Sequence, residues 1–364
     1  MNILSQIWFK VQTTLFPFIE DVFGSVSEKE KELIGILELA RIEEFVPMEI
    51  GGFQGRPLED RRSLARAFIA KAVYDIKTTS GLIERLKASR NLRAICGWEK
   101  ASEVPSESTF SRAFEEFAER RLAEKAHRSL IEKHARDRLV GHISRDATDI
   151  EGRERACKRE EKTEAPAPVR KKGRPKKGES RQPKEPSRLE KQIGMSVEEI
   201  LSDLPKCCDV GTKKKNGKTY HWKGYKLHLD WADGEIPISA ILTSASVHDS
   251  QAAIPLAKMT VERVTNLYDL MDAAYDAETI LSFSESLGHV PIVDRNRRKG
   301  EKTEMEPAVK RRYDERSTAE RGNSLLKEKF GARNVRVKGY TKVFAHLMFG
   351  IVALTADRLF NLLL

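Results

Sequence analysis

Apolar residues in the first 138 positions recur every three to four residues, the period of a helix with one buried face. The pattern runs through 27–45, 60–76 and 79–98, and each range is predicted to be a helix. Ser106 is placed to cap a fourth helix. The apolar face of this helix comprises Phe110, Ala113, Phe114 and Phe117. The pattern therefore predicts an all-helical N-terminal domain over residues 1–138.

Arginines accompany the last two of these helices. Two helices joined by a short polar connection can form a helix-turn-helix, which would turn Arg90, Arg93 and Arg112 toward DNA. The alternative is an ordinary helical bundle whose arginines are solvated. We predict that residues 1–138 bind DNA, with Arg112 among the contacts.

The pattern changes from helical to alternating at Leu139. A short apolar strand is predicted from there, with Asp146 at its C-terminal end. Residues 222–231 alternate, and the turn at 232–235 predicts a hairpin with the strand that follows. Two more short strands are predicted over 266–271 and 290–293. Helices are predicted over 251–263, 276–287, 313–327 and 343–364.

The order of these elements is informative. From residue 139 it reads β, long segment, β, β, α, β, α, β, α, α. This is the order of a ribonuclease-H-like fold, an α/β fold in which helices flank a mixed sheet. We predict such a domain over 139–364, preceded by the helical domain and carrying a basic insertion after its first strand.

The predicted insertion, 153–219, concentrates the positive charge of the chain. From Arg153 to Lys191 there are 15 Lys and Arg against 7 Asp and Glu, a net charge of +8 within a total of +10. Its Pro- and Gly-rich sequence buries little apolar surface, so we predict a flexible segment. A G-R-P core flanked by lysines resembles an AT-hook, which would lay Arg174 into a narrow minor groove. A solvated linker is the alternative.

The composition indicates which kind of molecule the protein binds and in which cellular compartment it is found. One-third of the 364 residues are charged, and the net charge of +10 favours an anionic partner, with nucleic acid as the first candidate. The four cysteines form no C-x-x-C pair, which argues against structural zinc and secreted disulfides. We expect reduced thiols and a cytoplasmic protein.

The C-terminal run 343–364 is apolar and long enough to reach across a bilayer. His346, Asp357 and Arg358 interrupt it, and such residues are costly inside a membrane. We therefore predict a buried helix and no membrane association. A membrane protein remains the alternative, which sedimentation with lipid would reveal.

The range 313–327 carries an unusual polar stripe. On a helix, four side chains fall within about 60° of one another. They are Tyr313, Arg316, Glu320 and Lys327. A solvated helix face is the ordinary explanation of a charged stripe. This stripe combines one acid with two cations and a phenol, so it has the groups to bind a metal ion and phosphates together.

The spacing Y-(2)-R-(3)-E-(6)-K of this stripe resembles the motif of a large group of bacterial insertion-sequence transposases of the DDE class. Two further stretches resemble the same family: V-P-S-E-S-T-F-S-R at 104–112, and L-M-D-A-A-Y-D around Asp272, where Ala274 stands in place of the usual glycine. The resemblance covers roughly 139–361 apart from the insertion, and more weakly the helical region.

The resemblance implies a catalytic triad of Asp146, Asp272 and Glu320. In a ribonuclease-H-like sheet these positions converge, and their carboxylates would bind two Mg²⁺ ions, with Mn²⁺ able to substitute. Asp149 is an equally placed rival to Asp146. Asp249, in V-H-D-S, also matches a family context, although helix capping explains it equally well.

The resemblance also assigns DNA contacts. Tyr313, Arg316 and Lys327 would hold phosphates of the transposon end near Glu320. Arg333 and Arg336 follow as further phosphate contacts, or as residues that only confer solubility.

The function implied is a transposase that binds double-stranded terminal inverted repeats, cleaves them with Mg²⁺ and joins them to target DNA. Two ends must be held together, so a homodimer on DNA in the bacterial nucleoid is expected. The alternatives are a stand-alone nuclease of the same fold, and a decayed transposase that only binds DNA.

Overall fold

The computed structural model describes the chain except for residues 1–5, 7–8, 48–58, 137, 158–185, 216, 296–303 and 363–364.

The N-terminal part is helical, as predicted. Ser27 caps the first long helix with a capping box, and Asp60 caps the next by accepting from the backbone of Arg62 and Ser63. The predicted helix over 79–98 is two helices, because Ser89 adopts an extended conformation and caps the second. The α-helices are α2 (Phe16–Phe23), α3 (Glu28–Ala40), α4 (Arg61–Val73), α5 (Thr79–Ala88), α6 (Arg90–Cys96), α7 (Glu107–Glu119) and α8 (Leu122–His134).

The second part contains a six-stranded mixed sheet in the order β2-β3-β1-β5-β6, with β4 paired to β3. β1 pairs antiparallel with β3 and parallel with β5. The predicted hairpin is formed by β3 and β4. The strands are β1 (Leu139–Glu151), β2 (Asp209–Lys215), β3 (Lys218–Ala232), β4 (Ile236–Ser244), β5 (Thr265–Met271) and β6 (Val290–Val293).

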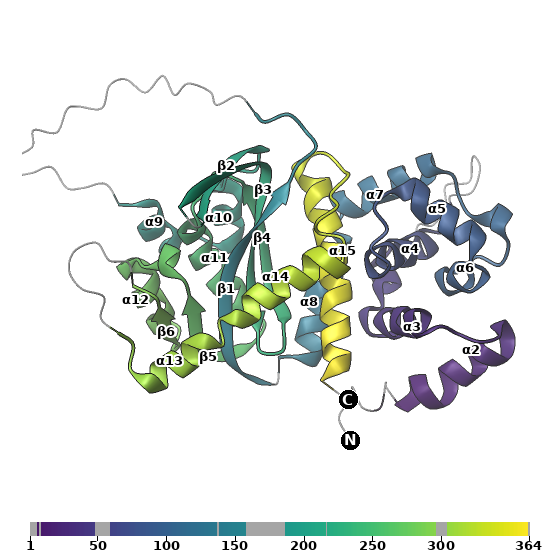
Figure 1. The fold of residues 1–364 in the computed structure, drawn as a ribbon, viewed down its shortest axis with the longest axis horizontal. Helices are drawn as coiled ribbons and strands as arrows, with labels where there is room; N and C mark the ends of the chain where they lie inside the picture. Colours follow the sequence, from purple (N-terminus) through teal and green to yellow (C-terminus); the bar gives the residue numbers. More distant parts are fainter. Residues whose placement is uncertain are drawn as a thin grey trace, which may run out of the picture.

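Helices cover both faces of this sheet, which confirms the ribonuclease-H-like α/β fold (Figure 1). On one face, Thr260 of α11 hydrogen-bonds to Asp230 of β3. On the other face, α14 lies against β1 and β3, where Gly322 meets the ring of Trp231. The helices are α9 (Arg188–Gly194), α10 (Val197–Asp203), α11 (Ala253–Val261), α12 (Glu278–Ser286), α13 (Pro307–Asp314), α14 (Ser317–Lys329) and α15 (Tyr340–Asn361).

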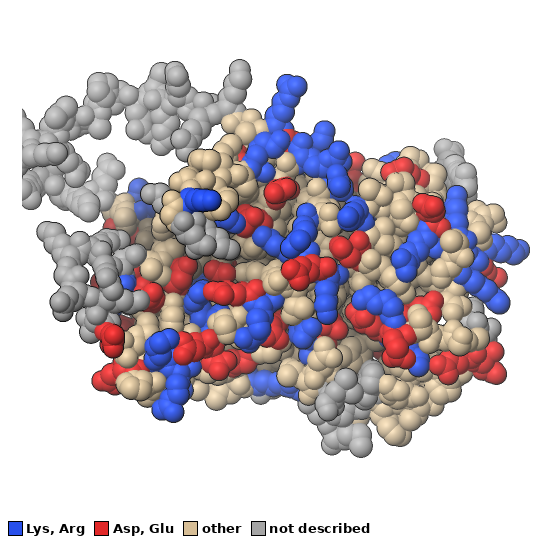
Figure 2. Space-filling model, viewed as in Figure 1, with Lys and Arg blue, Asp and Glu red and all other residues tan. Residues whose placement is uncertain are grey.

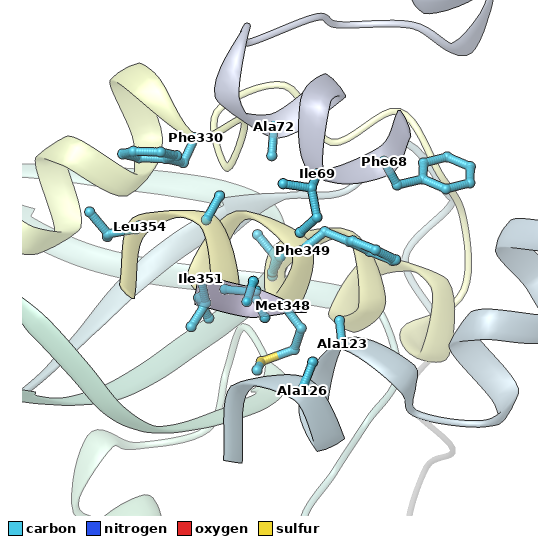
Figure 3. Close-up of a cluster of buried hydrophobic side chains, with 14 of the residues drawn as sticks. Phe68, Ile69, Ala72, Ala123, Ala126, Phe330, Met348, Phe349, Ile351 and Leu354 are labelled. Carbon is cyan, nitrogen blue, oxygen red and sulfur yellow. The ribbon is translucent and has the colours of Figure 1, made fainter. Parts of the chain in front are cut away.

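Helix α15 joins the two parts of the molecule. In Figure 1 it stands between the sheet and the N-terminal helices. Its apolar residues, including Met348, Phe349 and Ile351, pack against α4 and α8 in one continuous core (Figure 3). By length and composition α15 could cross a membrane, but 78% of its most apolar window is buried inside the protein. The predicted buried helix is therefore confirmed.

Three sequence predictions need correction. The strand predicted to end at Asp146 continues to Glu151, so Asp146 lies within β1. The predicted helix 313–327 is broken: α13 ends at Asp314, and Arg316 is the N-cap residue of α14. The described C-terminal part of the predicted insertion, 186–215 and 217–219, is folded, because α9 and α10 pack beside α11 and β2 pairs with β3.

Candidate functional site

The candidate site is built where β5 ends beside β1. The last parallel pair of these strands joins Arg145 to Met271; Asp146 is the next residue of β1, and Asp272 is the residue that directly follows β5. Neighbouring strands lie about 4.8 Å apart, and residues level with each other in a parallel pair point to the same face. The register therefore brings the two predicted acids together, although Asp146 is not at a strand end.

Burial and the negative charge of nearby acids act on both carboxyl groups. Burial raises the pKa of Asp146 to about 7; the positive charge of Arg316 opposes this shift, and the negative charges of Asp272 and Asp249 add to it. Burial also raises the pKa of Asp272, while the backbone N–H of Ala274 donates to its Oδ1 at 2.9 Å and opposes the shift. Ala274 needs no positive φ for this contact, so the absence of the usual glycine does not disturb the turn.

Glu320 reaches this pair through Arg316. The Arg316 guanidinium donates to Glu320 Oε1 at 2.7 Å, and its other terminal nitrogen lies 4.0 Å from Asp146 Oδ1. The Glu320 side chain is 64% exposed. Arg316 thus stands between the carboxylate of the helix and that of the strand. In this conformation the three acids do not share one cluster, and Glu320 is held by a cation instead.

Asn323 also contacts the acids. Its Nδ2 donates to Asp146 Oδ2 at 2.9 Å. Its Oδ1 is buried and has no hydrogen-bond partner among the described residues. No sequence pattern singled out Asn323, although its position three residues after Glu320 placed it on the same helix face.

Of the two readings left open for Asp249, helix capping is not the one that the structure shows. His248, not Asp249, caps the short 3-10 helix that precedes α11. Asp249 instead lies 2.8 Å from the Lys226 ammonium and is close enough to raise the pKa of both Asp146 and Asp272. The V-H-D-S context, which resembles a family sequence, was the signal that could have indicated a position near the two acids.

Asp149, the rival to Asp146, pairs with lysines. Its Oδ1 lies 2.7 Å from Lys213 and 3.3 Å from Lys327. Burial lowers the pKa of Lys327, and Asp149 opposes that shift. Asp149 therefore neutralises Lys213 and Lys327, of which Lys327 is a predicted phosphate contact. It is not part of the pair formed by Asp146 and Asp272.

The other predicted DNA contacts are distributed unevenly. The Tyr313 ring, at the end of α13, lies 5.9 Å from the Arg316 guanidinium. Arg333 and Arg336 are exposed in the loop between α14 and α15. Figure 2 shows lysines and arginines gathered along the upper edge of this face, over β2, β3 and the top of α15.

The remaining predicted arginines do not join this site. Arg112 is exposed on α7, which lies across α15 from the sheet (Figure 1). Arg93 does not face outward as predicted, because it is buried and donates to the backbone carbonyls of Leu86, Lys87 and Glu99. Arg174 and its AT-hook-like sequence lie outside the described residues.

The donor set fits a hard divalent cation. Among the described residues no group of three acids, histidines or cysteines is arranged to hold a metal ion. Mg²⁺, however, is usually held by one or two carboxylates and completes its octahedron with water and substrate phosphates. Asp146 and Asp272 supply two such oxygen ligands, and the unpartnered Asn323 Oδ1 beside them leaves a polar acceptor for a ligand.

The raised pKa of Asp146 predicts a dependence of stability on pH. An unfolded Asp titrates near pH 3.9, so between about pH 4 and 7 the folded protein binds more protons than the unfolded chain and loses stability as the pH rises. Asp146→Asn should therefore increase the free energy of unfolding most above pH 7, with the gain shrinking toward pH 4. Urea denaturation in EDTA from pH 5 to 8 measures this, and a gain that is constant with pH would contradict it.

Two family models match the chain. The Transposase DDE domain matches residues 146–356, which is more than half of the chain, and a transposase domain (DUF772) matches residues 27–116. Neither a curated protein nor a solved structure matches it. The first match begins at Asp146 and includes Asp272 and Glu320, and the second covers the N-terminal helices from α3 to most of α7. The chain therefore belongs to the DDE transposases of insertion sequences.

Proposed function

We propose that this transposase binds the terminal inverted repeats of its insertion sequence, cleaves their phosphodiester bonds with Mg²⁺ and transfers the ends to target DNA. The observation that carries the proposal is the convergence of Asp146 and Asp272 at the end of the β1/β5 pair, beneath a helix that presents Arg316 and Glu320. Hard oxygen ligands beside a phosphate-binding guanidinium are what in-line phosphoryl displacement requires.

Each residue has a role in this mechanism. Asp146 and Asp272 would hold the metal, and Glu320 would complete the site once its carboxylate is released from Arg316. An Mg²⁺ ion bound there would supply the charge that polarises the phosphodiester and activates a water or 3′-hydroxyl as the nucleophile. Arg316 is positioned to exchange Glu320 for a DNA phosphate, because a guanidinium binds either group in the same bidentate way. Tyr313, packed beside Arg316, fixes the orientation of that cation.

The DNA surface extends from this centre. Lys327, Arg333 and Arg336 continue from α14 into the loop toward α15 and bind the phosphate backbone. Arg112 and Arg174 provide contacts outside the catalytic centre. Two ends must be joined in one reaction, so the active complex is a homodimer on DNA in the bacterial nucleoid, with no membrane component.

The test uses the DNA that flanks the coding sequence. The purified protein should bind inverted repeats found there and nick them at their ends in the presence of Mg²⁺ or Mn²⁺. Pre-cut ends with a free 3′-hydroxyl separate the candidate functions: a transposase joins them to a target plasmid, and a stand-alone nuclease does not. Binding without any cleavage would identify a decayed transposase and overturn the proposal.

Lys327 provides a separate prediction about DNA binding. Lys327→Ala should weaken end binding and reduce the salt dependence of the binding constant by about one unit of slope, since one phosphate contact is lost. Asp149→Asn should strengthen binding, because it removes the acid that neutralises Lys327. Lys329→Ala, an exposed lysine on the same helix, is the control. Fluorescence anisotropy at several salt concentrations measures the affinity of all three variants for the DNA ends. Equal effects of Lys327→Ala and Lys329→Ala would contradict the assignment of Lys327 as a phosphate contact.

A further inference from the structure

Asn323 lies at the centre of the helix face that covers the candidate site. It follows Glu320 by three residues and precedes Lys327 by four, so all three side chains share one face of α14. The Glu320 side chain is 64% exposed, and Lys327 meets Asp149 of β1. Asn323 is only 7% exposed and points inward to the sheet, where its Nδ2 meets Asp146.

The neighbouring glycine allows this approach. A Cβ atom at Gly322 would lie 2.5 Å from ring atoms of Trp231, a fully buried residue of β3. Because a hydrogen replaces that atom, α14 can lie close enough to the sheet for the short Asn323 side chain to reach β1. The contact with Asp146 is therefore fixed by the packing of the helix and does not depend on a flexible side chain.

The two polar atoms of Asn323 have different surroundings. A carboxylate only accepts hydrogen bonds, so the Nδ2 donor faces Asp146, at 2.9 Å from its Oδ2. The Oδ1 atom is turned away from Asp146, is buried, and has no donor among the described residues. Buried acceptors are almost always paired in folded proteins, so an unpaired one beside a candidate metal site indicates a donor that arrives with a ligand.

We propose that Asn323 is a positioning residue for the metal-binding carboxylate of Asp146. Its N–H group holds Asp146 Oδ2 and fixes the orientation of the carboxylate, while its free Oδ1 accepts a hydrogen bond from a group that enters with the metal. The inference rests on the proposed function, because it takes Asp146 as a metal ligand. Partners that orient metal ligands typically change metal affinity by 10- to 100-fold when removed.

The test measures the affinity of the full-length protein for Mn²⁺ by calorimetry in the absence of DNA. Asn323→Leu keeps the approximate size of the side chain but removes both hydrogen-bonding atoms. We expect about 10- to 100-fold weaker Mn²⁺ binding, unchanged affinity for the DNA ends, and cleavage that recovers when the Mn²⁺ concentration is raised. Leu326→Val, in the buried face of the same helix, is the control for a purely structural effect and should leave the Mn²⁺ affinity unchanged.

The outcomes separate this inference from the proposed function. If Asp146→Ala abolishes Mn²⁺ binding and Asn323→Leu leaves it at the wild-type value, only the role of Asn323 is overturned. An equal loss of affinity in Asn323→Leu and Leu326→Val would also overturn it, because helix packing would then explain the effect. If Asp146→Ala binds Mn²⁺ as the wild type does, the metal assignment fails and the role of Asn323 fails with it.

Discussion

Replacing Asp146, Asp272 or Glu320 with alanine should reduce cleavage of the DNA ends by at least about a thousandfold, while binding of the ends is retained. A catalytic metal supplies several kcal/mol of transition-state stabilisation, and about 4 kcal/mol corresponds to a factor of a thousand in rate. The phosphate contacts lie on other residues, so the affinity for DNA should change little. Gel-shift and cleavage assays on the same inverted-repeat fragment measure both quantities.

Glu328→Ala is the matched control for Glu320→Ala. Both acids lie on α14, and Glu328 is also exposed and paired with an arginine, Arg333 at 3.5 Å. The Glu328→Ala variant should cleave DNA at the wild-type rate, because Glu328 lies two turns further along the helix and away from Asp146. Wild-type cleavage by any of the three acid variants would remove that acid from the metal site, and lost cleavage in Glu328→Ala would show that the assay reports a general defect of α14.

The second large effect should come from the buried ion pair of Arg145 and Asp230. Both side chains are at most 1% exposed, and the guanidinium donates to both carboxylate oxygens at 2.8 Å. Among the described residues, Arg145→Ala leaves the buried Asp230 carboxylate with the Thr260 hydroxyl as its one remaining side-chain donor. We expect a loss of about 3–5 kcal/mol in the free energy of unfolding, measured by urea denaturation.

Two further variants test whether the loss comes from the unpaired charge. Arg145→Met combined with Asp230→Leu removes both charges and should recover most of the stability. Arg128→Ala breaks an exposed pair with Glu132 and should cost less than about 1 kcal/mol. If Arg145→Ala costs no more than Arg128→Ala, the buried pair does not anchor β1 as described.

The ion pair also bears on the candidate site. Arg145 immediately precedes Asp146 and faces the opposite side of the sheet, toward α11, where Thr260 joins the same carboxylate. It also forms the last register pair with Met271 before Asp272. Holding Arg145 in place therefore holds the two acids level with each other. The sequence offered no signal for this role, since a lone arginine in a strand is usually read as solvated.

Two histidines are a second case of buried polar side chains that the sequence pattern assigns to solvent. None of the eight histidines forms an H-x-x-x-H pair, and the sequence alone favours a solvated helix face for His127 and His134. Both are buried, and His127 Nε2 lies 2.9 Å from the carbonyl of Pro237 in β4, which ties α8 to the sheet. Burial lowers the pKa of His127 to about 3, so it is neutral at physiological pH. A helix that touches neighbours on two sides buries polar positions that its hydrophobic period alone assigns to solvent.

The sequence by itself determined the class of fold, the order of its elements and the family. Hydrophobic periodicity depends on local geometry, and the period changes from helical to alternating at Leu139, where β1 begins. Asp272 was recognisable because it follows a short buried strand. The motif from Tyr313 to Lys327 was recognisable because its spacing is a property of the chain, even though the helix that carries it breaks before Arg316.

Only the tertiary structure decided which side chains meet. The β1/β5 register places Asp146 beside Asp272. The close packing of Gly322 against the Trp231 ring brings Asn323 to Asp146. Lys327 meets Asp149 from another element, and Asp249 approaches the acids from a loop. Most of these contacts join residues that lie far apart in the chain, and their geometry depends on how sheet and helices pack. A periodic pattern contains no information about such distances.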